Sequence, residues 1–263
     1  MPRQWLVIGR KATGYFYHLV AGELNNYYEW QIIVMETLVT QKVSIVLRPD
    51  MTDTTTIDRI KQKAHGLLMQ YGIRSVSMDD IATALGMSKK TIYQYFADKD
   101  ELVEAVIADK IKYNQDCCIK DKSQAKDAVH EVFLAIEMMQ DMFQNMNPSV
   151  IYDMEKFHPK AYDIFRQHKY NFLYKVLKQN IERGIKEELY RQDMNIDVIV
   201  KARLEGMMLA FNQQLFPQNK YSLVYVETQL TEHFLFGLAS PKGYKLILKY
   251  QQERAKKISN GGK

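Results

Sequence analysis

Ser77-Met-Asp-Asp-Ile-Ala-Thr-Ala-Leu-Gly86 is followed directly by Met87-Ser-Lys-Lys-Thr-Ile-Tyr-Gln-Tyr-Phe96. The first run predicts a short helix capped by Ser77, because Asp80 stands three residues later in a capping-box arrangement. The glycine that closes this run supplies a tight turn, and Ser88 caps a second short helix. Two short helices joined by a glycine-containing turn are typical of a helix-turn-helix motif.

The spacing within the second helix indicates which of its faces is free. Ile92 and Phe96 lie four residues apart and are expected to pack inward. Lysine neutralises phosphate and hydroxyl groups bind phosphate oxygens or base edges, so the remaining face suits the major groove of DNA. For any single lysine, a solvated surface charge is an equal alternative, and the tyrosines are alternatively half-buried packing residues. The free face comprises Lys89, Lys90, Thr91, Tyr93, Gln94 and Tyr95.

Residues 81–102 read Ile-Ala-Thr-Ala-Leu-Gly-Met-Ser-Lys-Lys-Thr-Ile-Tyr-Gln-Tyr-Phe-Ala-Asp-Lys-Asp-Glu-Leu. This run resembles the signature of the tetracycline-repressor (TetR) family of bacterial regulators, and the helical pattern before it fits the first helix of that family. The spacing Thr-Ile-Tyr-x-Tyr-Phe-x-x-Lys is the most specific part of the resemblance. The resemblance implies the following DNA-contacting residues: Ser77, Ser88, Lys89, Lys90, Thr91, Tyr93, Tyr95 and Lys99.

These residues have different implied roles. The helix capped by Ser88 is the third helix of the DNA-binding domain. By the resemblance, its start faces bases and phosphates, while Tyr93, Tyr95 and Lys99 fall where the family usually binds phosphates. Ser77 lies near the DNA backbone. Asp79 is unfavourable, because some members carry a base-reading basic residue there and a carboxylate repels phosphate. Sequence specificity is therefore expected to depend on the third helix and on DNA shape.

The chain on either side of the motif has a helical pattern. Apolar residues recur at three- and four-residue steps from Ile57 to Tyr71, and Gly72 ends that helix. After about residue 125, apolar stripes are separated by helix breakers, and no β-hairpin signal interrupts them. The predicted fold class is all-α, with an N-terminal three-helix helix-turn-helix DNA-binding domain (55–112), a helical effector-binding and dimerisation domain (113–240) and a basic C-terminal tail (241–263).

The C-terminal half holds the candidates for effector binding and dimerisation. The resemblance implies an effector pocket between helices, and a homodimer formed by the helices near 196–214 and 222–238. Thioether side chains adjust to irregular ligands, which suits an adaptable pocket, although such a stripe at helical spacing is more often plain core. Core packing within one subunit explains many apolar residues of the two helices equally well. The pocket candidates are Met139, Met142, Phe143, Tyr152, Tyr170 and Met208.

Composition limits the argument from charge. The formal net charge is +5 at pH 7, but much of it lies after Lys242, and acidic and basic residues balance over 51–112. Contact with DNA must therefore come from the placement of a few side chains. Cys117 and Cys118 are adjacent, which excludes a disulfide framework and fits the reducing cytoplasm. The sequence shows neither a signal peptide nor a membrane span.

Residues 1–50 differ from the rest of the chain. They hold both tryptophans, Trp5 and Trp30, and lack a long amphipathic period, so no structure is assigned to them. One hypothesis is that translation starts at Met51 and that these residues are an upstream extension of the reading frame. The other is an accessory segment whose aromatic residues pack on the body. Finding peptides from 1–50 in protein from its own host would exclude the first hypothesis.

Signatures of catalysis are absent from the sequence. It contains no phosphate-binding loop, dinucleotide glycine fingerprint, His-Glu-x-x-His motif or nucleophile elbow. The prediction is therefore no enzyme, no cofactor and no metal, and inert cysteines rather than a redox sensor. The residues that would supply metal ligands only if folding gathered them are Asp153, Glu155, His158 and His168.

The predicted function is a cytoplasmic, homodimeric regulator of transcription. It would be a repressor that binds a near-palindromic double-stranded operator and responds to a small-molecule effector of unknown identity. One alternative is a DNA-associated structural or division-linked protein with the same fold. The other is a small-molecule-binding module without DNA binding, for which Lys90→Ala and Tyr93→Ala would leave function untouched.

Overall fold

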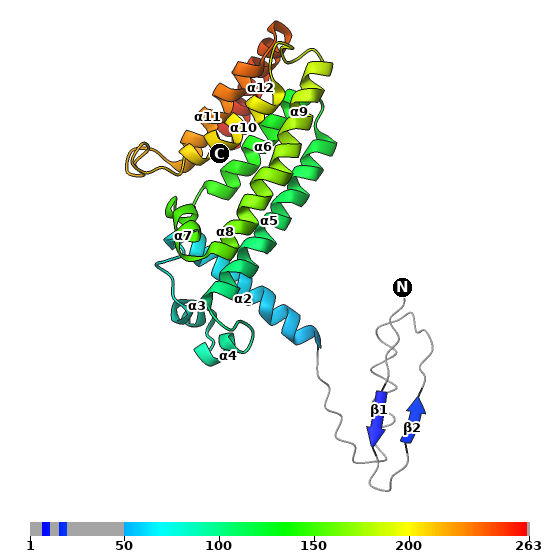
Figure 1. Ribbon diagram of the computed structural model, residues 1–263, viewed down its shortest axis with the longest axis vertical. Helices are drawn as coiled ribbons and strands as arrows, with labels where there is room; N and C mark the ends of the chain where they lie inside the picture. Colours follow the sequence, from blue (N-terminus) through cyan, green and yellow to red (C-terminus); the bar gives the residue numbers. More distant parts are fainter. Residues whose placement is uncertain (1–6, 11–15, 20–49, 262–263) are drawn as a thin grey trace. The chain divides into compact units, whose positions relative to one another are not determined.

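The computed structural model describes residues 7–10, 16–19 and 50–261, and the chain divides into two compact units between Asp50 and Met51 (Figure 1). In the first unit, β1 (Val7–Arg10) pairs antiparallel with β2 (Phe16–Leu19), and Val7 lies opposite Leu19. The sequence did not predict this hairpin. Most of residues 1–50 lies outside the described residues, so both hypotheses about this segment stay untested.

The second unit is helical throughout its described residues, which confirms the all-α fold class for this part of the chain. Within the described ranges, no helix combines the length and apolarity that a membrane crossing requires. The helices α2, α3 and α4 gather at one end, and longer helices run side by side from there (Figure 1). The elements are α2 (Asp50–Tyr71), α3 (Met78–Leu85), α4 (Lys89–Tyr93), α5 (Lys99–Gln124), α6 (Ala128–Phe143), α7 (Ser149–Phe157), α8 (Pro159–Gln167), the π-helical η1 (His168–Leu173), α9 (Tyr174–Lys186), α10 (Ile196–Leu209), α11 (Leu223–Leu238) and α12 (Pro241–Gly261).

A first hydrophobic core holds the three N-terminal helices together. Ile60, Ala64 and Leu68 repeat every four residues along α2 and are almost completely buried. Ile81 of α3 and Ile92 of α4 are both fully buried in the same cluster. Each such side chain contributes about 1.5 to 3 kcal/mol on burial, so this core fixes the position of α4.

Helix α4, the second helix of the helix-turn-helix motif, is shorter than predicted. It was expected to reach Phe96 but ends at Tyr93. The N–H groups of Gln94 and Tyr95 donate to carbonyls three residues earlier, which tightens the last turn. Phe96 is nevertheless buried, as its spacing from Ile92 predicted.

A further helix boundary differs from the prediction. The helix expected to span 196–214 ends at Leu209, because the Asn212 side chain accepts hydrogen bonds from the N–H groups of Gln214 and Leu215 and forms a turn. The π-helical turn η1 lies directly between α8 and α9. α5 is continuous through residue 112, where the boundary between the two domains was drawn.

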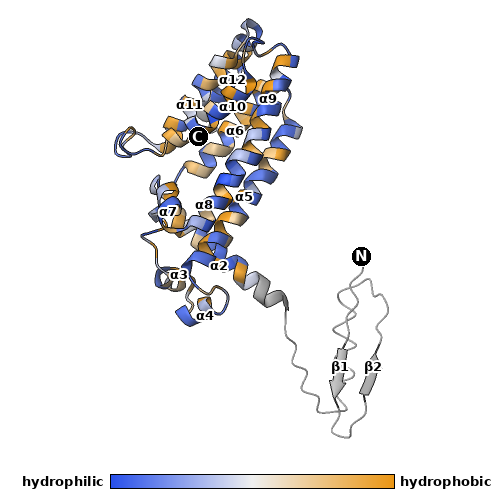
Figure 2. Cartoon of the chain, viewed as in Figure 1, coloured by the Kyte–Doolittle hydropathy of each residue, from blue (hydrophilic) through white to orange (hydrophobic). Residues whose placement is uncertain are grey.

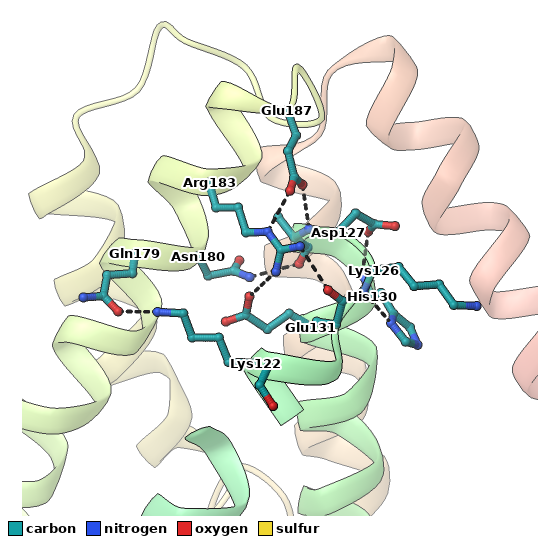
Figure 3. Close-up of polar contacts among 12 residues, drawn as sticks. Lys122, Lys126, Asp127, His130, Glu131, Gln179, Asn180, Arg183 and Glu187 are labelled. Carbon is teal, nitrogen blue, oxygen red and sulfur yellow. Dashed lines mark hydrogen bonds and ion pairs between the residues drawn. The ribbon is translucent and has the colours of Figure 1, made fainter. Parts of the chain in front are cut away.

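A polar network joins the start of α6 to α9 (Figure 3). Arg183 donates from Nε to Glu187 at 2.7 Å and from Nη1 to Glu131 at 3.2 Å. Its Nη2 donates to the Ala125 carbonyl, while Glu187 accepts from the N–H of Ala128. The network therefore satisfies backbone groups that the break between α5 and α6 leaves unpaired.

The basic tail forms a helix that packs on a second hydrophobic core, whose buried residues include Phe133, Leu204 and Leu235. Ile247 of α12 is fully buried, and the Tyr250 hydroxyl donates to Asp127 at 2.7 Å. The Tyr250 ring also stacks on His130 of α6. The C-terminal segment is thus an integral part of the helical bundle.

Candidate nucleic-acid interface and effector cavity

Serine hydroxyl groups start both helices of the motif, as the sequence predicted. Ser77 accepts from the N–H of Asp80 at 3.2 Å, and its own N–H and hydroxyl donate to the Asp80 carboxylate, which completes the capping box. These hydrogen bonds lower the pKa of Asp80. Ser88 accepts from the N–H of Thr91 at 3.1 Å, and the two hydroxyl oxygens lie 2.8 Å apart. Both serines are exposed at the ends of helices that the core holds in place.

The first turn of α4 points to solvent. Lys89 and Lys90 are exposed, and Tyr93 is 43% exposed. Figure 2 shows that most of α4 is hydrophilic. Among the described residues, no hydrogen-bond or ion-pair partner approaches the ammonium group of Lys90. This turn therefore presents a free cation beside a phenol hydroxyl, which is chemistry that suits a phosphate-lined groove.

Lys89 has a protein partner that sequence reasoning missed. Its ammonium group donates to the Asp79 carboxylate of α3 at 2.8 Å, and this hydrogen bond raises the pKa of Lys89. Asp79 was expected to repel phosphate, yet the two opposite charges lie against each other across the turn. The pair links α3 to α4 and leaves Lys90 as the unpaired lysine of this turn among the described residues.

Two of the residues assigned to phosphate binding are partly engaged within the protein. Lys99 is half-buried and donates from Nζ to the Ile73 carbonyl at 2.6 Å, and loss of solvation lowers its pKa. Tyr95 is also half-buried and packs against the first core. Their contact with DNA stays a prediction. Lys99 joins the start of α5 to the loop after α2, and Tyr95 packs the residues after α4 on the first core.

An apolar cavity of about 140 Å³ lies between the two cores. Its walls come from α2, α5, α6, α7, α8, η1, α10 and α11. Of the six pocket candidates, Met142, Phe143 and Met208 line it. Met139 is instead buried in the second core, and Tyr152 and Tyr170 are about half exposed outside the cavity.

Tyr152 and Tyr170 have surface partners that explain their position. The Tyr152 hydroxyl accepts from Lys156, and the Tyr170 hydroxyl donates to Glu205 at 2.7 Å. Both side chains follow the polar outer faces of their helices. The periodicity of a single helix did not distinguish these faces from the inner ones.

The cavity also holds ionisable groups. His168 contacts Gln115 through Nδ1 at 3.1 Å, and burial lowers its pKa to about 4. Lys169 pairs with Glu205 at 3.0 Å. Glu227 of α11 is the sole carboxylate among the described residues that line the cavity.

The candidate metal ligands do not come together. Among the described residues, no group of three or more His, Cys, Asp or Glu side chains has the arrangement of a metal site. Asp153 accepts from the N–H of Arg74, and His158 lies 2.6 Å from a carboxylate oxygen of Asp100. Burial raises the pKa of the Cys118 thiol to about 11, so the thiol stays protonated near neutral pH.

Comparison with known proteins agrees with this geometry. Residues 60–106 match the model of the bacterial regulatory proteins of the tetR family. Over 108 residues the chain is 30% identical to the HTH-type transcriptional regulator YvaF of Bacillus subtilis (strain 168), an alignment that covers 40% of this chain and 55% of that relative. The chain thus spans little more than half the length of YvaF.

Solved structures share the fold over most of the chain. A TetR-family transcriptional regulator from Agrobacterium tumefaciens superposes with a TM-score of 0.61 at 15% identity, covering 72% of this chain and 100% of that one. A transcriptional regulator from Saccharomonospora viridis, solved in complex with choline, gives a TM-score of 0.60 at 19% identity, covering 71% and 99%. A capped helix-turn-helix followed by a helical domain defines a class of DNA-binding fold. Within that class, the model of the tetR family of bacterial regulatory proteins covers residues 60–106 of this chain, which include the whole helix-turn-helix.

Proposed function

We propose that the protein is a sequence-specific DNA-binding regulator of transcription, and that it acts as a repressor rather than as an enzyme. The observation that carries this proposal is the exposed first turn of α4, with Lys90 and Tyr93 free on a helix anchored by Ile92. In this arrangement α4 enters the major groove while the ends of α3 and α5 lie near the phosphate backbone. Such a regulator acts in the cytoplasm, where its operator lies.

We further propose that the active form is a homodimer. Exposed residues on α10 recur at helical steps, including Val198, Ala202 and Leu209, and Tyr225 of α11 is 55% exposed. Burying this surface against a second copy would remove apolar area from water. A two-fold dimer would place two α4 helices in successive major grooves of a near-palindrome, roughly 34 Å apart.

The cavity is the proposed effector site. Val150, Ile151 and Met154 of α7 line it, while Asp153 of the same helix accepts a hydrogen bond from the loop before α3. A molecule that moves α7 would therefore act on the DNA-binding helices. By linkage, DNA must then weaken effector binding as strongly as the effector weakens DNA binding.

Selection of bound sequences from random duplex DNA, with the full chain, tests DNA binding. We expect the selection to recover a near-palindromic site. The Tyr93→Ala variant is expected to bind DNA of every sequence more weakly than the unmodified chain does. Lys90→Ala is expected to make the free energy of binding to the selected site less favourable by about 1 to 3 kcal/mol and to relax sequence preference. Lys175→Ala on α9 and Tyr113→Ala on α5 are the matched controls at exposed positions. Recovery of no preferred sequence, or equal binding by Lys90→Ala and Lys175→Ala, would contradict the proposal.

A promoter reporter tests the direction of regulation. The protein is expected to lower transcription from a promoter that carries the selected site, and Lys90→Ala is expected to restore it. Higher transcription in the presence of the protein would show an activator instead. Many dispersed genomic binding sites, rather than a few promoters, would favour a structural role on DNA.

A further inference from the structure

Glu227 is a buried carboxylate to which none of the described residues donates a hydrogen bond. Its side chain is 2% exposed, and neither carboxylate oxygen has a hydrogen-bond partner among the described residues. The nearest cation, Arg203, lies 3.7 Å away from Nη2 to Oε1. That same Nη2 donates instead to the Thr231 hydroxyl at 2.6 Å. Arg203 thus supplies charge near Glu227 but no hydrogen bond to it.

This arrangement is costly for the protein alone. A buried polar group left without its hydrogen bonds destabilises the fold, and a charged group does so more strongly than a neutral one. Burial also raises the pKa of Glu227 to about 7, against the opposing effect of Arg203. Because Glu227 lines the cavity, a ligand with N–H donors can make the hydrogen bonds that the protein does not.

The other ionisable groups around the cavity already have partners or are neutral. Lys169 is paired with Glu205, and the Lys110 ammonium lies 4.5 Å from the centre of the Tyr113 ring. Burial lowers the pKa values of both lining histidines, His65 and His168, and His168, with a pKa of about 4, is neutral at physiological pH. Among the described ionisable groups of the cavity, the Glu227 carboxylate is therefore the one that still lacks hydrogen-bond donors.

The rest of the wall limits the body of the ligand. It is mostly hydrocarbon and thioether, and includes Met142, Phe143, Met146, Met207 and Met208. Methionine side chains adapt to irregular shapes and make favourable contacts with aromatic rings. An apolar cavity of roughly 150 Å³ accepts a benzene-sized molecule, so a compact body fits this one.

We propose that the cavity binds a small apolar amine whose protonated N–H groups donate to the Glu227 carboxylate while its hydrocarbon body packs on the methionines. This inference rests on the proposed function, in which the cavity holds the effector. A primary or secondary amine meets the requirement better than a quaternary ammonium group, because only the former carries N–H donors.

Calorimetric titration of the full chain with four probes tests the proposal without DNA. Benzylamine is expected to bind at least tenfold more tightly than ethylbenzene, its uncharged isostere, and more tightly than benzyltrimethylammonium, which lacks N–H donors. Phenylacetate is expected to bind least, since its carboxylate would face Glu227. Failure of benzylamine to bind, equal binding of benzylamine and ethylbenzene, or tightest binding of phenylacetate overturns the proposal.

Glu227→Gln tests the residue itself. The variant is expected to lose the preference for benzylamine over ethylbenzene, while Glu182→Gln, an exposed carboxylate on α9, keeps it. A Glu227→Gln protein that is folded by circular dichroism and retains the preference overturns the assignment. If that variant does not fold, the comparison of the four probes on the unmodified chain decides alone.

DNA binding is measured separately, so that the two proposals fail in different ways. If the selected operator is bound but benzylamine is not, this inference fails and the regulator remains. If benzylamine binds through Glu227 and leaves operator affinity unchanged, the amine site remains and the proposed effector role fails.

Discussion

Asp153 accepts a hydrogen bond from the backbone N–H of Arg74 at 2.9 Å, and this contact joins α7 to the loop that precedes α3. The N–H of Asn147, just before α7, donates to the Met69 carbonyl of α2 at 2.7 Å, so this part of the chain is hydrogen-bonded both to α2 and to the loop after it. Because Val150, Ile151 and Met154 of α7 line the cavity, this one helix contacts both the cavity and the loop that precedes α3.

Gly72 sets how closely α7 approaches this loop, and it gives the first prediction. Its φ is +88°, and a Cβ there would lie 2.8 Å from the Ser149 hydroxyl oxygen. Gly86 has a similar φ of +65° but open space around it. We expect Gly86→Ala to lower the free energy of unfolding by about 1 kcal/mol through backbone strain, and Gly72→Ala to lower it further through crowding.

A double-mutant cycle measured by urea denaturation separates the two effects. Ser149→Ala is expected to recover part of the loss in Gly72→Ala and none of the loss in Gly86→Ala. Additive effects of Gly72→Ala and Ser149→Ala would show that α7 does not crowd the turn.

The Lys89–Asp79 pair gives a prediction for DNA affinity. Asp79→Ala removes a negative charge beside α4, the helix proposed to enter the groove, and frees Lys89. We therefore expect tighter operator binding. The slope of log K against log salt is expected to become steeper by up to about one unit. Fluorescence anisotropy across a salt series measures both. Asp58→Ala is the matched control, because that acidic residue pairs with Lys61 on α2.

The same pair predicts an order among the lysines. Lys89→Ala is expected to weaken binding less than Lys90→Ala in the unmodified chain, because the charge of Lys89 is already compensated. In the Asp79→Ala background the two losses are expected to become similar. Weaker DNA binding by Asp79→Ala itself would show that the pair is needed to hold α4 in place.

The dimer prediction concerns the outer face of α10. Leu209 is 44% exposed in the single chain, so Leu209→Arg is expected to leave the fold intact and to prevent association. Sedimentation velocity measures the mass of the species, and DNA affinity is expected to fall with it. Leu215→Arg, at a position 56% exposed beyond the end of α10, is the control. A Leu209→Arg protein that remains a dimer would place the interface elsewhere.

Whether the sequence predicted a contact depended on how far apart its two residues lie along the chain. The caps at Ser77 and Ser88 depend on residues three positions away, and both were predicted. The contact of Lys99 with the Ile73 carbonyl joins residues 26 apart, and no local pattern indicates it. A lysine at such a position therefore has the same local sequence whether it binds phosphate or protein.

The cavity shows the same limit more strongly. Its walls come from elements far apart in the chain, so helical periodicity identified inward faces but not which core each face joins. Met139 and Met142 illustrate this, because they lie one turn apart on α6 and only Met142 lines the cavity. Glu227 was not selected because a single acidic residue in a helix gives no sign of its burial.

Glu227 gives the last prediction, on stability against pH. Its pKa is raised from 4.5 to about 7 by burial, so the folded state holds the proton more tightly than the unfolded chain does. The stabilisation is full below pH 4.5 and is lost as pH rises through about 7, with a total of up to about 3 kcal/mol. Two partly buried histidines act in the opposite direction, since burial lowers the pKa values of His65 and His168 and their protonation in acid destabilises the folded state.

The comparison with Glu227→Gln isolates the carboxyl group, because both histidines remain in that variant. Urea denaturation at pH 5 and pH 8 is expected to show that the unmodified chain loses more stability than Glu227→Gln between the two values. Addition of benzylamine at pH 8 is expected to reduce that difference, since its N–H donors stabilise the ionised carboxylate. Identical pH dependence of the two proteins would mean that Glu227 titrates near its ordinary pKa and that solvent reaches it, which would remove the physical basis of the amine site.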